Sequence, residues 1–382
     1  MTHEQLTAKF SELFQVSAQG IVSAPGRVNI IGEFTDYNDG FVLPCSLEFK
    51  TQVVYSLRDD NQVVVQSLHY PGEIEQFSVD TDIVTGNSQW GNYIRAVAFV
   101  LKRAGYNLQG VNLLIDSNVP QGSGLSSSAA LEVAVGGMFN QVANLALTAE
   151  QIALFGQQAE NDFMDCQCGI MDQLISAKGE TGHALLIDCQ SLETRAFSIP
   201  DDLSIVIVNS NYPRKLVDSE YNQRRIDCEQ AAVKMEVKTL RAANMALLQS
   251  KKAVMSDNEY KRAHHVISEN ERVVKATAAL QNNDMQALRA LMTASHLSLK
   301  NDFEVTVPAT DGLVNICQEA LGERGAVRMT GGGFGGAIVC LCRSEDVDVI
   351  KQAVEEKYYQ RFNLSADIYV CKAGSGLQTF KL

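Results

Sequence analysis

Glycines and serines are concentrated in residues 119–130, whose sequence is VPQGSGLSSSAA. The apolar run 111–116 before it predicts a strand, and the small and apolar residues 129–142 after it predict a helix. A glycine-rich turn from strand to helix binds anions because free backbone N–H groups converge where the helix dipole is positive. Serine hydroxyls add donors, and one of them is free to ligate Mg²⁺. The pattern therefore predicts a site for nucleotide phosphates.

Two better-known phosphate loops do not fit this segment. A Walker A loop requires a lysine, and none occurs between Val119 and Asn140. A dinucleotide-binding turn requires a third glycine where Ser127 stands and an acidic residue about twenty positions later, but residues 141–144 are QVAN. A turn that merely lets a helix pack closely would explain the glycines alone. The three consecutive serines 126–128 favour the phosphate site.

A second polar segment, residues 24–40, reads APGRVNIIGEFTDYNDG. Its arginine, carboxylates, amides and hydroxyls could hold a polyol, because carboxylates accept from sugar hydroxyls while arginine donates. The alternative is a solvated loop. Val28, Ile30 and Ile31 argue against a solvated loop because they would be buried and would hold the polar residues near a core. A third segment, GGGFGG at 331–336, predicts a backbone that closely approaches another group.

Length and composition limit the function. A chain of 382 residues predicts two domains, and a net charge of −13 argues against nucleic acid or an anionic membrane as partner. The nine cysteines show no disulfide-like spacing, and Cys166 and Cys168 lack the second pair of a zinc site, so buried free thiols are expected. No apolar run reaches membrane-spanning length. These features predict a cytoplasmic protein with small-molecule substrates.

Up to residue 216 the sequence predicts both strands and helices. Residues 216–300 contain no glycine and have a composition that predicts helices only. We place the domain boundary at residues 199/200, which gives domains 1–199 and 200–382. Strands are expected at 20–23, 51–57, 63–67, 74–79, 111–116, 184–188, 204–210, 327–330, 337–342 and 366–371. Helices are expected at 4–14, 92–103, 129–142, 148–162 and 345–361, in addition to the helical region.

Together these segments resemble the GHMP small-molecule kinases and, among them, the galactokinase family. The segment 24–40 is similar to the galactokinase signature, GSGLSSSAALEVA (122–134) to the family's phosphate loop, and RMTGGGFGGAIV (328–339) to its third motif. CGIMDQ (168–173) and SEYNQRR (219–225) match as well. The resemblance implies an α+β fold with an N-terminal domain of the ribosomal-protein-S5-like type, a ferredoxin-like C-terminal domain and an active site in the cleft between them.

The resemblance also implies a reaction: transfer of the γ-phosphate of Mg·ATP to the 1-hydroxyl of α-D-galactose. We expect the protein to be a monomer. Asp172 matches the proposed base and Arg27 the residue that stabilises the transition state; without the resemblance, an ordinary structural ion pair would be the simpler interpretation. Ser128 and Glu160 match the Mg²⁺ ligands. The implied sugar contacts are Glu33, Phe34, Thr35, Asp36, Gly169 and Tyr221, and the implied ATP contacts are Gly122, Ser123, Gly124, Leu125, Ser126, Ser127 and Ser128. Trp90 and Tyr93 either lie beside the adenine or serve packing.

One residue departs from the family pattern. Galactokinases carry histidine where this chain has Phe34, so a hydrogen bond from the imidazole to the sugar would be lost.

Two alternatives to galactose phosphorylation remain: a kinase for another sugar such as N-acetylgalactosamine or arabinose, and a sensor that binds galactose and ATP without catalysis. Sensors of this kind can lack residues of the phosphate loop, whereas this chain keeps Ser126–Ala130, Arg27 and Asp172.

Overall fold

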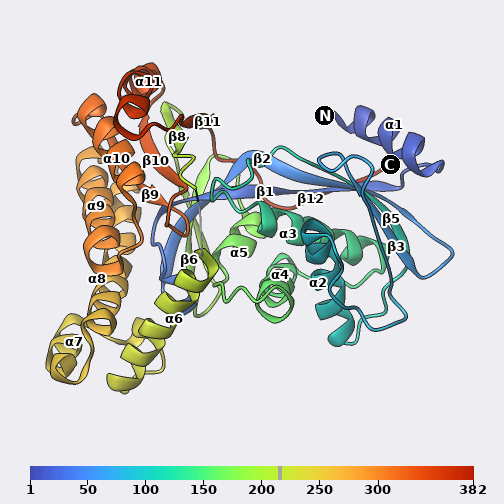
Figure 1. Ribbon diagram of the computed structural model, residues 1–382, viewed down its shortest axis with the longest axis horizontal. Helices are drawn as coiled ribbons and strands as arrows, with labels where there is room; N and C mark the ends of the chain where they lie inside the picture. Colours follow the sequence, from blue (N-terminus) through green and yellow to red (C-terminus); the bar gives the residue numbers. More distant parts are fainter. Residues whose placement is uncertain (214–216) are drawn as a thin grey trace.

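The structure is a computed structural model that describes residues 1–213 and 217–382. Two β-sheets organise it (Figure 1). Within the described residues the first sheet has the order β12-β1-β2-β5-β3-β4, with β6 paired to β2 and β7 to β6. Its strands are β1 (Gly20–Ile31), β2 (Phe41–Leu57), β3 (Gln62–Ser67), β4 (Ile74–Ser78), β5 (Val111–Ser117), β6 (His183–Asp188), β7 (Thr194–Ser198) and β12 (Gln378–Lys381).

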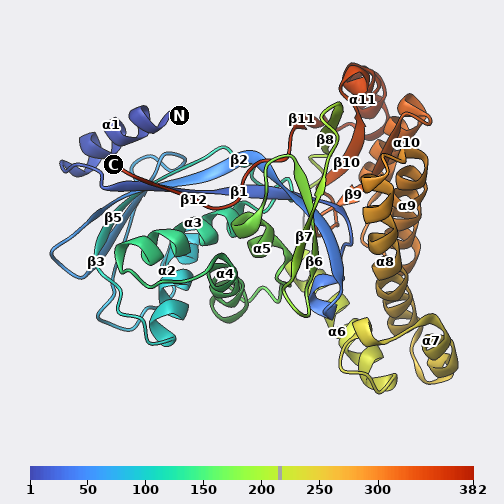
Figure 2. The same cartoon turned by 180° about the vertical axis from the view of Figure 1, so that it is seen from behind.

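Helices cover both faces of this sheet because its side chains alternate between them. On β2, Val53 and Tyr55 face the larger core, which contains α2 (Gln89–Arg103), α3 (Ser127–Val142), α4 (Ala149–Phe163) and α5 (Met171–Lys178). Val54 between them faces the opposite side and packs against α1 (His3–Phe14). Figure 2 shows α2 to α5 gathered on one side of the long strands and α1 on the other.

The second sheet is antiparallel with the order β11-β8-β10-β9, formed by β8 (Leu203–Asn209), β9 (Gly325–Thr330), β10 (Ala337–Arg343) and β11 (Asp367–Cys371). Numbered along the chain, these strands lie in the order 4-1-3-2, which is the ferredoxin-like arrangement. Helices α10 (Pro308–Leu321) and α11 (Val347–Phe362) pack on one face. The other face shares a core with the first sheet and with α8 (Asp257–Gln281) and α9 (Met285–Ser298).

The remaining helices, α6 (Val217–Lys234) and α7 (Met245–Lys251), precede α8 in the helical region (Figure 1). Short 3₁₀ turns occur at Asp36–Asn38, Leu240–Ala242, Lys252–Val254 and Ser344–Asp346, and a π-turn at Leu299–Phe303. No helix in the described ranges combines the length and apolarity that a membrane span needs.

The structure confirms the α+β class and most predicted elements, but the first strand is much longer than predicted. β1 continues from Gly20 to Ile31, whereas a strand was predicted only for residues 20–23, followed by a polar segment with buried apolar residues. All its residues are buried, and register shifts at Pro25/Arg27 and Asn29/Ile31 let it bend. β7 and β12 were not predicted. Leu216, the first residue of the predicted helical region, lies outside the described residues.

The domain boundary at residues 199/200 stays a prediction. One strand of the second predicted domain does not respect this boundary. β12 pairs antiparallel with β1, with Gly20 opposite Lys381, so the last strand returns to the first sheet.

Candidate active site

Arg27 and Asp172, which are 145 positions apart in the sequence, form a bidentate ion pair. Arg27 Nε donates to Asp172 Oδ1 at 2.8 Å, and Nη2 donates to Oδ2 at 2.7 Å. Arg27 lies on β1 and Asp172 in the first turn of α5. Ser126 Oγ also donates to Asp172 Oδ2, and Arg27 Nη1 donates to the carbonyl oxygen of Gly124 at 2.6 Å. The ion pair therefore sits directly against the serine-rich loop.

The loop between β5 and α3 has the backbone that the glycines predicted. Gly122 and Gly124 have φ of 70° and 77°, and Ser126 precedes α3 with φ of 60°. A Cβ on Gly331, in the third glycine-rich segment, would lie 3.2 Å from the carbonyl oxygen of Gly124. The third segment thus packs against the loop, as its glycines required. The helix begins at Ser127, two residues earlier than predicted, so Ser127 and Ser128 lie in its first turn.

A cavity of about 260 Å³ opens at this point. It brings together most of the predicted site: Arg27, Glu33, Phe34, Asp36, Gly122, Gly124, Leu125, Ser126, Ser127, Ser128, Glu160, Gly169, Asp172 and Tyr221. Thr35 and Ser123 are left out of the lining. The hydroxyl of Thr35 is within hydrogen-bonding distance of the carbonyl oxygens of Gly32 and Phe41. The hydroxyl of Ser123 donates to the carbonyl oxygen of Pro120. Both hydroxyls stabilise their own loops.

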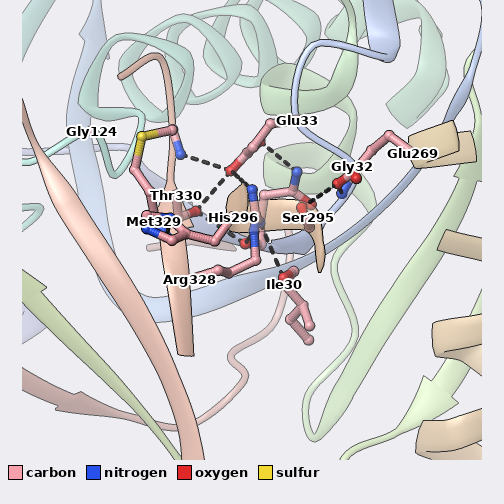
Figure 3. Close-up of polar contacts among 12 residues, drawn as sticks. Ile30, Gly32, Glu33, Gly124, Glu269, Ser295, His296, Arg328, Met329 and Thr330 are labelled. Atoms are coloured by element: carbon pink, nitrogen blue, oxygen red, sulfur yellow. Dashed lines mark hydrogen bonds and ion pairs between the residues drawn. The ribbon is translucent and has the colours of Figure 1, made fainter. Parts of the chain in front are cut away.

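Glu33 is held by groups from both halves of the chain (Figure 3). Its Oε1 accepts hydrogen bonds from Thr330 Oγ1 at 3.0 Å and from the Gly331 N–H at 2.7 Å. The fully buried Arg328 places Nη2 3.3 Å from the same oxygen, and Asn29 Nδ2 donates to Oε2 at 2.6 Å. The carboxylate is consequently fixed where the segments 24–40 and 331–336 meet.

Helix α8 of the helical region holds the backbone of the same loop. Glu269 accepts from the Gly32 N–H at 3.0 Å, and His265 Nε2 lies 3.1 Å from the Glu33 carbonyl oxygen. Burial lowers the pKa of His265 to about 4, so its ring is neutral at physiological pH and donates through Nε2–H to that carbonyl. The β1–β2 loop is therefore positioned by residues more than 200 positions away.

Asp36 forms another wall of the cavity in contact with Gly169. A Cβ on Gly169 would lie 2.1 Å from Asp36 Oδ2, so only glycine fits there. Burial, together with the neighbouring Asp172 carboxylate, raises the pKa of Asp36 to about 6. This carboxyl group therefore titrates just below neutral pH.

Phe34 belongs to a cluster of aromatic side chains at the edge of the cavity. It adopts a left-handed backbone conformation with φ of 64°, and its ring stacks on Phe303 with centroids 4.5 Å apart. Tyr221 on α6 lies 5.7 Å away, centroid to centroid. Phe34 thus gives the cavity an apolar wall.

The donors around Ser128 and Glu160 fit a hard cation. Both side chains line the cavity, and a hydroxyl with a carboxylate is suited to Mg²⁺ whose other ligands are waters and phosphates. The buried Glu132 faces Glu160, and its Oε1 has no hydrogen-bond donor among the described residues. Burial and the charge of Glu160 raise the pKa of Glu132 well above its usual value. Gln173 Nε2 donates to the other Glu132 oxygen at 3.0 Å, so a single carboxyl oxygen beside Glu160 is left without a donor in the described part of the chain, which is consistent with a cation held nearby.

A second hollow of about 570 Å³ adjoins the first and shares Ser127 and Ser128 with it. Trp90 and Tyr93 line it, and the indole ring of Trp90 stacks on Tyr70 with centroids 5.6 Å apart. An aromatic hollow beside the loop between β5 and α3 is suited to a flat base.

Sequence reasoning missed several residues of the cavity wall: Cys166, Cys168, Met171, Gln173, Gly331 and Gly332. The expectation that all cysteines are buried is wrong for Cys166 and Cys168, which are half-buried in the loop between α4 and α5. Cys168 is the first residue of CGIMDQ and Cys166 stands two positions before it, and this was the signal that could have placed both beside Asp172.

Comparison with known proteins agrees with this arrangement. Residues 92–180 match the model of the GHMP kinases N-terminal domain, 276–360 that of the GHMP kinases C-terminal domain, and 8–57 the galactokinase galactose-binding signature. The galactokinase of Lactococcus lactis, solved in complex with galactose, is 34% identical with a TM-score of 0.94 over 99% of each chain.

More distant structures share the fold alone. A mevalonate kinase from Methanococcus jannaschii is 15% identical, with a TM-score of 0.65 over 94% of this chain and 99% of that one. A D-glycero-D-manno-heptose 1-phosphate kinase from Bacteriodes thetaiotaomicron is 13% identical, with a TM-score of 0.60 over 95% and 99%. The chain belongs to the GHMP kinase family and, within it, to the galactokinases, which are ATP-dependent sugar kinases.

Proposed function

We propose that the 1-hydroxyl of α-D-galactose, bound between Asp36 and Asp172, attacks the γ-phosphate of ATP to give galactose 1-phosphate and ADP. The observation that carries this proposal is the position of Asp172. Its carboxylate is fixed by two hydrogen bonds from Arg27 on β1 and one from Ser126, so it lies between β1 and the loop that joins β5 to α3.

Phosphoryl transfer depends mainly on positioning and charge neutralisation. Asp172 orients the attacking hydroxyl and accepts its proton. Burial alone would lower the pKa of Arg27, but the carboxylates of Asp172 and Glu33 outweigh that effect and raise it, so the guanidinium stays charged. Arg27 can therefore hold Asp172 and contact the transferring phosphate. The backbone N–H groups and hydroxyls of Gly122–Ser128 bind the phosphates.

Ser128 and Glu160 would hold Mg²⁺, which neutralises charge on the phosphates when it is bound. The adenine would occupy the hollow at Trp90 and Tyr93, where stacking on an aromatic ring is favourable.

A panel of acceptors tests the proposed substrate. Galactose, N-acetylgalactosamine, arabinose and glucose are each incubated with Mg·ATP, and both ADP and the sugar phosphate are quantified. We expect the highest kcat/KM for galactose with equal amounts of ADP and galactose 1-phosphate. A higher kcat/KM for another sugar would assign the chain to that sugar, and binding of galactose and ATP without any product would identify a sensor.

Phe34→His is expected to increase the preference for galactose over 6-deoxygalactose. A missing hydrogen bond to a bound polar group costs about 1–3 kcal/mol, which is roughly five- to a hundred-fold in kcat/KM. The measurement is the ratio of kcat/KM for the two sugars in each protein. Phe34→Leu, which removes the ring without adding a donor, is the control. If the ratio is the same in wild type and Phe34→His, this residue does not affect sugar preference.

The kcat/KM for galactose is expected to fall as the pH is lowered through about 6. Asp36 has a pKa of about 6 and accepts hydrogen bonds from sugar hydroxyls best when it is ionised, so its protonation at lower pH weakens binding. The pH profile of kcat/KM measures this effect, and Asp36→Asn should lower kcat/KM and remove the titration near pH 6. A wild-type profile that is flat between pH 5 and 7 would contradict the role of Asp36.

A further inference from the structure

Cys166 and Cys168 differ from the other cysteines of the chain. Of the nine cysteines, seven are buried, whereas these two are half-buried in the loop between α4 and α5. Both line the cavity that contains Asp172. A small reagent that enters the active site can therefore reach these two thiols and not the others.

The two cysteines also lie in one short turn of the chain. The Cys168 N–H donates to the Cys166 carbonyl oxygen at 2.8 Å, which closes a tight three-residue turn. A disulfide requires Cα atoms about 4.4–6.8 Å apart, a separation that such a turn provides. A disulfide across so small a ring is strained and hence easily reduced.

We propose that Cys166 and Cys168 form a reversible oxidation site, at which a peroxide converts the dithiol into a disulfide and lowers the activity of the enzyme. The effect on activity rests on the proposed function, whereas the oxidation itself does not.

The chemistry needs only the two thiols and hydrogen peroxide. One sulfur attacks a peroxide oxygen, which breaks the O–O bond and gives a sulfenic acid and water. The second sulfur then attacks the sulfenic sulfur, forms the S–S bond and releases the hydroxyl as a second water. The dithiol loses two electrons and two protons in total, and the peroxide is reduced to two waters.

Disulfide formation would disturb residues on both sides of the loop. Gly169 follows Cys168 and leaves no space against Asp36, so any shift of Cys168 moves the proposed sugar site. The Cys166 N–H donates to the carbonyl oxygen of Glu160 at 3.1 Å, so a shift there changes the proposed metal ligand. Gln173, adjacent to Asp172, contacts the Cys168 sulfur at 4.0 Å. A single covalent bond would therefore act on all three parts of the site.

To test the proposal, the full chain is treated with hydrogen peroxide, and the masses of its peptides and its kinase activity are measured. We expect the peptide that contains both cysteines to lose two hydrogen atoms, kcat/KM for galactose to fall at least about tenfold, and dithiothreitol to restore both. Galactose with ADP should slow the oxidation because they fill the cavity. A peptide that stays reduced while the enzyme is inactivated would overturn the proposal, as would a disulfide that leaves activity unchanged.

Variants that lack one cysteine distinguish oxidation at this site from oxidative damage elsewhere in the protein. After treatment with peroxide and assay without dithiothreitol, Cys166→Ser and Cys168→Ser should each keep the activity that the same variant has before treatment. Neither variant can form the disulfide. Cys189→Ser, which removes a buried thiol, should remain as sensitive as wild type. Equal sensitivity of all three variants would contradict the assignment. If the chain phosphorylates no sugar, the proposed function fails, but the peptide masses still decide whether the disulfide forms.

Discussion

Asp172→Asn is expected to lower kcat for galactose phosphorylation by about 10²–10⁴-fold and to change KM for ATP little. A positioned general base contributes an effect of this size, and an amide cannot accept the proton of the attacking hydroxyl. The variant also loses the charge-assisted bonds from Arg27, which are 2.8 and 2.7 Å long in the wild type. A coupled assay of ADP release over a range of both substrates gives the two constants.

Asp60→Asn is a matched control for this substitution. Asp60 is half-exposed and accepts the same bidentate pair of hydrogen bonds from Arg58, but lies outside the cavity. Its substitution should leave kcat unchanged. Ser126→Ala removes one donor to Asp172 and keeps the carboxylate, so its loss should be smaller than that of Asp172→Asn. Equal turnover by wild type and Asp172→Asn would show that Asp172 is not the base.

Arg328→Met is expected to lower the free energy of unfolding by about 3–5 kcal/mol and to raise KM for galactose. Removing one partner of a buried ion pair leaves the other charge uncompensated, and here that charge is the Glu33 carboxylate. The substitution also removes the hydrogen bonds from Arg328 to the carbonyl oxygens of Asn29 and Ile30, each 3.1 Å long. Denaturant unfolding and steady-state kinetics measure the two effects.

Two variants distinguish positioning of Glu33 from general loss of stability. Thr330→Val removes the hydroxyl that donates to Glu33 without removing a charge, so KM for galactose should rise with a small loss of stability. Arg58→Met, at a partly exposed ion pair outside the cavity, should leave KM for galactose unchanged and lower the stability less than Arg328→Met. If Arg328→Met unfolds more easily but binds galactose with unchanged KM, the arginine supports the fold without positioning the sugar site.

Local patterns were sufficient to predict the glycine-rich turn between β5 and α3 and several helices. Thr148 and Gln151 form a capping box at the start of α4, where the sequence predicts a helix from residue 148, and the glycines around residue 123 adopt the backbone that only glycine adopts readily. The extent of β1 could not be predicted, because Gly26 and Asn29 are atypical of a strand. Asn29 pairs with Pro44 of β2, and Gly26 lies at the register shift between Pro25 and Arg27. β12 similarly exists only because β1 offers its free edge.

The convergence of Arg27, Asp172 and Ser126 was expected from family resemblance and not from periodicity. The hydrogen-bond network around Glu33 could not be predicted from the sequence, for a physical reason. Its donors come from residues 29, 328, 330 and 331, and a long-range contact of this kind leaves no local pattern. The half-burial of Cys166 and Cys168 likewise depends on how α4 and α5 pack around the cavity.

The central claim is that the anomeric oxygen of galactose, oriented by Asp172, attacks the γ-phosphorus of ATP. Galactose labelled with ¹⁸O at C1 tests it most directly, with the product examined by ³¹P NMR. We predict that the label is retained as the oxygen that bridges C1 and phosphorus in galactose 1-phosphate, and that Asp172→Asn forms this product far more slowly. Loss of the label, phosphate on another hydroxyl, or the same rate in the variant would contradict the account.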